Sequence, residues 1–300
     1  MEAGETANKI ILPQGADSQE ESTLCTPQQI NVGEVISKKF RKRLPRVVIR
    51  LLERLICQDE INYVLREYGQ YEGMEFVEKL MYYFGIKLEI LGEERLPQNP
   101  RALFVCNHPL GGLDGICLSH LIGQHYHSDI RYIVNDMLLF LHPFRNIFVP
   151  VNTLHGQSRD SVKRVGDALS SDYPVISFPA GICSRLIDGK IQDLPWKTSF
   201  VKQALKSKRD IVPLFFYGYN SRSFYKIEQL RKKVGIKFNI GTALLPKEMF
   251  AAKGSCFAIA VGEPLQYQNL IDSKLSVNDI SALVRHKVYL LGEEFHLKTR

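Results

Sequence analysis

Two short motifs carry the side chains that could do chemistry in this chain of 300 residues. The first, residues 107–115, has the sequence NHPLGGLDG and follows directly on the apolar run 102–106. Its two central glycines would let the loop curl back, so that the carboxylate of Asp114 could reach the imidazole of His108. A carboxylate on one ring nitrogen fixes the tautomer and leaves the other nitrogen free to take a proton. The motif therefore predicts a general base, with the alternative that Asp114 is only a helix N-cap and His108 an ordinary loop residue.

The second motif, residues 178–185, has the sequence FPAGICSR and also follows an apolar run typical of a buried strand. The Gly181 amide, the Ser184 hydroxyl and the Arg185 guanidinium could together bind an anion. The alternative is an ordinary surface turn. Arg145, just before another apolar run, could point into the same cleft or simply be solvated.

Other reactive side chains are interpreted as structural. His125 and His127 are two residues apart, as metal ligands on a strand can be, but they fall in an expected loop, so we predict no metal site. Cys183 is interpreted as a small packed residue rather than a nucleophile. The chain's six cysteines form no C-x-x-C pair, which is typical of a reduced, cytosolic protein without disulfides.

Apolar periodicity beyond residue 70 alternates between strands and helices. Strands are expected at 86–91, 102–106, 131–134, 146–151, 174–178, 211–217 and 256–262, and helices at 59–67, 74–84, 114–123, 158–171, 199–208 and 277–293. This alternation predicts a single α/β layered domain, with a mostly parallel sheet flanked by helices and with helices preceding it. No apolar run is long enough to span a membrane, and the first residues do not resemble a secretory signal.

The excess positive charge of the chain is concentrated in one segment. The net charge is +7, and residues 38–54 hold eight basic side chains and one acidic one, which leaves 31 of each elsewhere. The segment 46–56 can form a helix with arginines on one narrow face and aliphatic side chains over the rest, which suits a membrane interface. The alternative is a helix packed on the body with a solvated basic edge. A neutral body argues against a nucleic-acid partner.

The order of these motifs resembles the glycerophospholipid acyltransferase superfamily, whose best-known members are lysophosphatidate acyltransferases. The matching residues are Asn107, His108 and Asp114, then Phe178, Pro179, Gly181, Ser184 and Arg185, and finally Val212-Pro213. The sequence IAVGEPL at 259–265 is similar to the family's closing segment. Two departures stand out. Five residues separate His108 from Asp114 instead of four, as in the hemolysin-like bacterial subset with an H-P-x-G-G-x-D motif, and Ala180 stands where the family carries Glu.

The resemblance implies an O-acyltransferase of membrane lipid synthesis, organised as a disordered tail (1–30), a basic amphipathic membrane-associating segment (31–70) and an acyltransferase domain (71–300). It further implies that His108 is the base, that Asp114 orients it, and that Arg145, Gly181, Ser184 and Arg185 bind substrate. The acyl donor would be a thioester of acyl carrier protein or CoA, the acceptor a lyso-lipid, and no cofactor would be needed. The enzyme would be cytoplasmic and peripheral on the inner face of the membrane.

The absence of Glu at position 180 affects the expected acceptor. A site that keeps its cation but lacks this acid should suit an anionic lipid without the glycerol phosphate pattern, such as a hydroxylated N-acyl amino acid. Two alternatives remain open: an N-acyltransferase acting on an amino acid or amine, and a non-catalytic lipid-binding relative.

Overall fold

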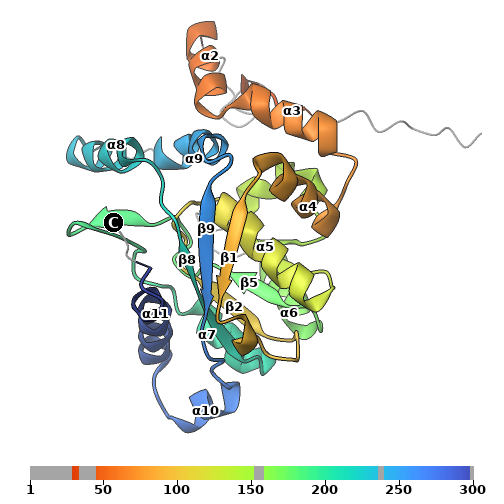
Figure 1. The fold of residues 1–300 in the computed structure, drawn as a ribbon, viewed down its shortest axis with the longest axis vertical. Helices are drawn as coiled ribbons and strands as arrows, with labels where there is room; N and C mark the ends of the chain where they lie inside the picture. Colours follow the sequence, from red (N-terminus) through yellow and green to blue (C-terminus); the bar gives the residue numbers. More distant parts are fainter. Residues whose placement is uncertain (1–28, 34–44, 152–158, 236–239, 298–300) are drawn as a thin grey trace, which may run out of the picture.

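A seven-stranded sheet forms the centre of the computed structural model, which describes residues 29–33, 45–151, 159–235 and 240–297 (Figure 1). From one edge to the other its strands are β1 (Lys87–Leu91), β9 (Cys256–Val261), β8 (Ile211–Tyr217), β2 (Leu103–Cys106), β5 (Val175–Ser177), β3 (Arg131–Asn135) and β4 (Phe148–Val151). Neighbouring strands run parallel, except that β8 and β9 pair antiparallel. The prediction of a mostly parallel α/β sheet is confirmed.

Helices cover both faces of this sheet because its strands are apolar on both sides. In β2, Leu103 and Val105 join one core, whereas Phe104 and Cys106 join the other. The first core lies against α6 (Arg159–Ser170), α7 (Ser199–Ser207), α10 (Tyr267–Asp272) and α11 (Val277–Glu294), and the second against α3 (Gln58–Tyr68), α4 (Gly73–Phe84) and α5 (Leu113–Tyr126). The site-bearing loops thus emerge from a rigid three-layer frame.

The structure contains elements between the predicted ones. These are a two-stranded hairpin of β6 (Arg185–Ile187) and β7 (Lys190–Gln192), and the helices α8 (Arg222–Lys233), α9 (Ile240–Ala251) and α10. Helix α9 escapes prediction because it carries no amphipathic pattern and holds Pro246 in its interior, where proline normally breaks a helix. The predicted strands and helices themselves form within two or three residues of their expected bounds.

The amphipathic helix expected over 46–56 forms as α2 (Arg46–Leu55), and none of its residues is buried. Its last residue, Leu55, packs against a buried cluster that includes Leu244 of α9 and Phe224 of α8. Val47 and Leu51, by contrast, are 77% and 64% exposed. The expected tail lies almost wholly outside the described residues, as does the basic run 38–43. Within the described ranges, no helix is both long and apolar enough to cross a membrane.

A buried arginine that the sequence analysis did not single out lies at the N-terminal ends of β2 and β8, away from the site. Arg209 is fully buried and donates hydrogen bonds to backbone carbonyls at the end of α6, among them Leu169 at 2.9 Å, and to the carbonyl of Ala102 before β2 at 3.1 Å. These bonds satisfy carbonyls that a helix end leaves unpaired. They fix the start of β2, whose other end carries the first motif.

Candidate active site

The first motif begins where β2 ends, and Asn107 fixes its starting point. The Asn107 side chain donates to the carbonyl of Phe216 at 3.0 Å and accepts from the Phe216 amide at 2.7 Å. Through these two bonds the Asn107 side chain continues the pairing between β2 and β8 beyond the end of β2. The backbone position just before His108 is therefore fixed.

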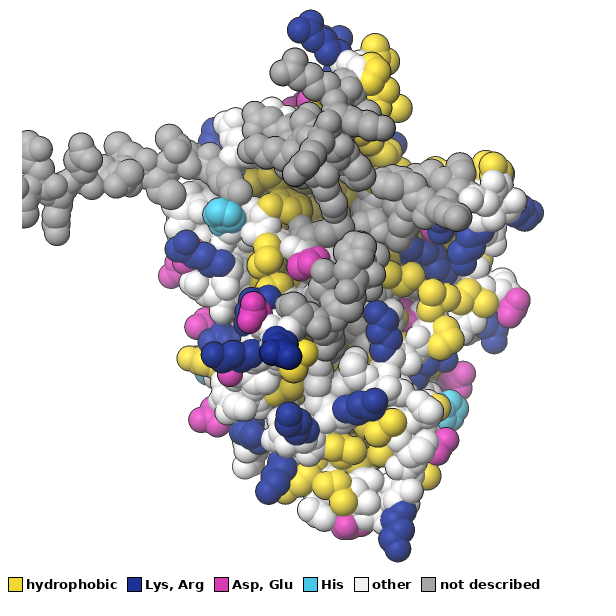
Figure 2. Space-filling model, turned by 180° about the vertical axis from the view of Figure 1, so that it is seen from behind, with side chains coloured by type: hydrophobic (Ala, Val, Ile, Leu, Met, Phe, Trp, Pro, Cys, Tyr) yellow, Lys and Arg dark blue, Asp and Glu magenta, His cyan; other side chains and the backbone are white. Residues whose placement is uncertain are grey.

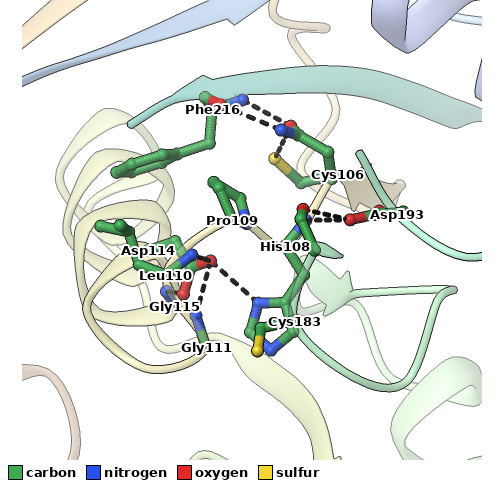
Figure 3. A network of polar contacts seen from close by, with 12 residues as sticks. Cys106, His108, Pro109, Leu110, Gly111, Asp114, Gly115, Cys183, Asp193 and Phe216 are labelled. Carbon is green, nitrogen blue, oxygen red and sulfur yellow. Dashed lines mark hydrogen bonds and ion pairs between the residues drawn. The ribbon is translucent and has the colours of Figure 1, made fainter. Parts of the chain in front are cut away.

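Asp114 is a fully buried anchor for the whole loop. One carboxylate oxygen accepts hydrogen bonds from His108 Nδ1 at 2.9 Å, from the Leu110 amide at 2.9 Å and from the Gly111 amide at 3.2 Å, and the other accepts the Gly115 amide at 3.0 Å (Figure 3). Helix α5 begins at Leu113 with Gly112 as its N-cap residue, so the alternative of Asp114 as an N-cap is wrong. Burial by itself would raise the pKa of Asp114, but His108 and these amides outweigh it, so the pKa is lowered and the carboxylate is charged.

The predicted curl of the loop is present, and it requires glycine at 111. Gly111 has φ +78°, a conformation that other residues rarely adopt. A Cβ atom there would lie 2.6 Å from Leu245 Cδ1 on α9 and 3.1 Å from Cys183 Cβ. The backbone, α9 and the second motif therefore meet too closely at this point for any side chain.

His108 has the geometry of a base with one free nitrogen. Its ring stacks on Phe178, with centroids 4.0 Å apart and planes inclined by 22°, and its side chain is 14% exposed. Burial would lower the pKa of His108, but the charge and hydrogen bond of Asp114, helped by Asp193, raise it. In the described part of the chain Nε2 has no hydrogen-bond partner, so it can meet a substrate proton.

The second motif lies beside the first, but its polar groups are bonded within the protein. The Gly181 amide donates to the Phe178 carbonyl at 3.0 Å, and Ser184 Oγ donates to Asp193 at 2.6 Å. Arg185 is 3% exposed, forms an ion pair with Glu228 of α8 at 3.4 Å and donates to the Cys183 carbonyl at 2.8 Å. These polar groups are therefore satisfied within the protein, because a buried guanidinium needs a carboxylate partner and α8 supplies it. Their binding of a substrate anion stays a prediction.

Arg145 is not brought to the site either. Its side chain is 64% exposed and forms an ion pair with Glu72, the N-cap residue of α4. Asn146 donates to the other oxygen of the same carboxylate at 2.8 Å. This cluster joins the start of α4 to the loop before β4. The Arg145 charge therefore has a partner within the protein.

The sequence analysis missed two residues that lie beside the motifs. Asp193, after the hairpin, is buried and accepts hydrogen bonds from the His108 amide at 3.2 Å, Ser184 Oγ and the indole of Trp196 at 2.9 Å. Its carboxylate thus joins the two motifs, and burial raises its pKa. Exposed Lys197 lies over the second motif, because a Cβ on Gly181 would be 3.1 Å from its Nζ. Neither has a motif or periodic signal in a single sequence.

The remaining reactive side chains are placed as structural groups. Burial raises the pKa of the Cys183 thiol to about 11, which keeps it protonated near neutral pH. His125 contacts Glu93 at 3.2 Å, and His127 ends α5. Across the described ranges, no three His, Cys, Asp or Glu side chains are grouped so that they could hold a metal ion.

With this geometry in view, comparison with known proteins identifies the family. A family model described as acyltransferase matches residues 34–297. This chain is an acyltransferase of that family. A relative in Phocaeicola vulgatus, named lyso-glycine lipid O-acyltransferase, is 40% identical over 248 residues, covering 82% of this chain and 89% of that protein. A second relative of the same name, in Bacteroides thetaiotaomicron, is 39% identical over 248 residues, which cover 82% of this chain and 91% of that protein.

The acyltransferase is also similar to a protein of known structure. The 1-acyl-sn-glycerophosphate (LPA) acyltransferase of Thermotoga maritima is 14% identical, with a TM-score of 0.47 over 89% of this chain and 88% of the other. The family match spans both motifs. The geometry of the His108–Asp114 loop makes it the candidate site of the acyltransferase.

Proposed function

We propose that this acyltransferase moves a fatty acyl chain from an acyl thioester to the hydroxyl of a lyso-lipid, with His108 as the general base. The observation that carries the proposal is the contact of His108 Nδ1 with buried Asp114, which leaves Nε2 available. Family membership supports the reaction class, and the two relatives, by their names, support the oxygen acceptor.

The mechanism follows from this orientation. The acceptor hydroxyl donates its proton to Nε2 of His108 while its oxygen attacks the thioester carbonyl. Asp114 holds the imidazolium that forms, at a distance of 2.9 Å. Collapse of the tetrahedral intermediate breaks the carbon–sulfur bond, and His108 returns the proton to the departing thiol of CoA or acyl carrier protein. General-base catalysis of this kind contributes about 10²–10⁴-fold, and positioning of the two substrates supplies the rest.

The acceptor we propose is a hydroxylated N-acyl amino acid, of which a lyso-glycine lipid is the form suggested by the names of the relatives. Because Arg185 is paired with Glu228, we assign the acceptor carboxylate to Lys197. Lys197 is exposed and lies over the turn of Phe178, the ring that stacks on His108. Among the residues that the structure describes, Lys197 forms no ion pair, so its charge is available for an acceptor carboxylate.

The membrane contact we propose is the segment 38–57, which includes α2. Its basic side chains and the exposed Val47 and Leu51 suit the headgroup region of an anionic bilayer, where a lyso-lipid acceptor resides.

The acceptor is tested by comparing kcat/KM for an N-(3-hydroxyacyl)glycine with kcat/KM for lysophosphatidate, using acyl-CoA and acyl carrier protein as parallel donors. We expect at least a tenfold preference for the glycine acceptor, and Lys197→Gln should raise its KM about tenfold. Lys202→Gln, an exposed lysine of α7, is the control and should change neither value. A tenfold preference for lysophosphatidate would contradict the proposed acceptor, and transfer to free glycine instead would indicate an N-acyltransferase.

A further inference from the structure

Helix α8 presents an exposed aliphatic stripe that no part of the described chain covers. Ile227, Leu230 and Val234 are 39%, 61% and 65% exposed. They are spaced i, i+3 and i+7, so the three side chains lie on one side of α8, with Val234 as its C-cap residue. A stripe of this kind in water is unfavourable unless a partner removes it from solvent.

The exposed charges of α8 are all positive. Its sequence RSFYKIEQLRKK contains one acid, Glu228, which is 2% exposed and bonded to Arg185, Arg231 and the Gly241 amide. At about 100° per residue, Lys226 and Lys233 border the aliphatic stripe along one edge. An apolar stripe edged by cations complements an anionic lipid surface.

The place of α8 in the fold connects this surface with the site. Strand β8 runs parallel to β2, so α8 begins at the same edge of the sheet as the His108 loop. Asn220, just before α8, donates to the Pro109 carbonyl at 3.2 Å, and the Glu228–Arg185 ion pair joins α8 to the second motif. Motion of α8 is therefore restrained relative to His108.

Helix α8 also lies at the same end of the molecule as α2. Leu55 of α2 packs against the buried cluster that Phe224 and Tyr225 of α8 form with Leu244 of α9 and Cys183. The ribbon shows α2 at the same end of the molecule as α8 and α9 (Figure 1). The space-filling view shows lysine and arginine side chains beside exposed hydrophobic ones on the side where α8 lies, at the upper right (Figure 2). Both helices combine basic and exposed aliphatic side chains, and this repetition at one end favours a broad lipid surface over a single protein partner.

We propose that α8 is a second membrane-contacting helix, which rests on anionic lipid and holds the active-site edge of the acyltransferase close to the bilayer. It adds to the contact proposed for 38–57 and does not depend on the identity of the acceptor. An acidic protein such as acyl carrier protein is the competing occupant that the experiment distinguishes.

The experiment measures binding of the full chain to vesicles of phosphatidylcholine with 30% phosphatidylglycerol, by flotation at low and at high salt. Lys226→Gln/Lys233→Gln should weaken binding about tenfold or more at low salt, and Leu230→Ser/Val234→Ser should weaken it similarly at both salts. The matched controls are Lys206→Gln/Lys287→Gln on α7 and α11, and Ile271→Ser/Leu275→Ser near α10, all exposed and on other elements. The controls should bind as the unaltered chain does.

Arg50→Gln/Leu51→Ser on α2 is measured in parallel so that the two contacts are separated. If the α2 variant loses vesicle binding while both α8 variants keep it, the inference about α8 is overturned and the contact of 38–57 stands. If the unaltered chain does not bind vesicles, both are overturned. If the α8 variants keep vesicle binding but lose affinity for acyl carrier protein, α8 is a protein-docking helix and the lipid assignment is wrong.

Discussion

The pair of His108 and Asp114 shows how one buried carboxylate can do two tasks. Its four hydrogen bonds hold the loop in its curled form and also fix the tautomer of the base. An isolated buried carboxylate would take up a proton, but these donors and the nearby imidazole keep the Asp114 pKa low. The same interaction raises the pKa of His108, so the residue is a stronger base than a free imidazole.

The Asp114→Asn variant tests this coupling by its pH dependence. A base with a raised pKa is protonated and inactive over a wider acidic range, so kcat/KM should fall as the pH drops through the His108 pKa. Asparagine removes the charge that raises this pKa, so the acidic limb should move to lower pH, while the plateau falls by roughly a hundredfold. The measurement is the pH profile of kcat/KM for both proteins, with the single Trp196 reporting folding by fluorescence. An acidic limb at the same pH in both would show that Asp114 does not tune His108.

At the scale of elements, the loop is held by parts of the chain that are distant in sequence. Leu245 of α9 lies against Gly111, Asp193 after the hairpin bonds the His108 amide, and Glu228 of α8 neutralises Arg185. The second motif therefore supports His108, with its Phe178 ring stacked on the imidazole. This arrangement explains why a serine and an arginine typical of anion binding can be buried beside the site.

The Gly111→Ala variant tests the contact between the loop and α9. The left-handed backbone of Gly111 costs another residue about 1–3 kcal/mol, and the new methyl group meets Leu245. We expect kcat/KM to fall at least tenfold and the free energy of unfolding to fall by about 1–3 kcal/mol, measured by urea titration. Leu245→Ala in the same chain should restore part of the activity, because it removes the overlap but not the backbone strain.

Gly166→Ala is the matched control for this variant. Gly166 lies in the helical interior of α6, and a Cβ there meets nothing within 4 Å, so the exchange should be neutral or slightly stabilising. Wild-type activity in Gly111→Ala would mean that the loop can adopt another active conformation.

At the scale of the whole molecule, local patterns predicted the layers but not the tertiary partners. The run Leu103–Cys106 alternates between two cores, and such a fully apolar strand indicates a buried parallel sheet from sequence alone. The His108–Asp114 contact was also predictable, because five intervening residues that include two glycines can close a loop. Helix α9 was not, since Pro246 and its even apolarity hide it.

The roles of the charged residues depended on the fold as a whole. Arg185 appeared free to bind substrate because its partner Glu228 is 43 residues away in sequence and belongs to a helix that was not predicted. For Arg145 the sequence leaves a place in the cleft open, because its partner Glu72 is far away in sequence, at the start of α4 before β1. In both cases the carboxylate partner is set by the tertiary fold, and this partner determines the role of the arginine.

The central claim is that His108 takes the proton from an acceptor hydroxyl during acyl transfer. The most direct measurement is transfer of a labelled acyl group from its thioester to an N-(3-hydroxyacyl)glycine, followed by mass spectrometry, for the unaltered chain and His108→Ala. His125→Ala, which removes a partly exposed histidine paired with Glu93, is the control. We expect His108→Ala to fold normally and to lose about 10²–10⁴-fold in rate, while the control keeps its activity. Wild-type turnover by His108→Ala would show that His108 does not take this proton.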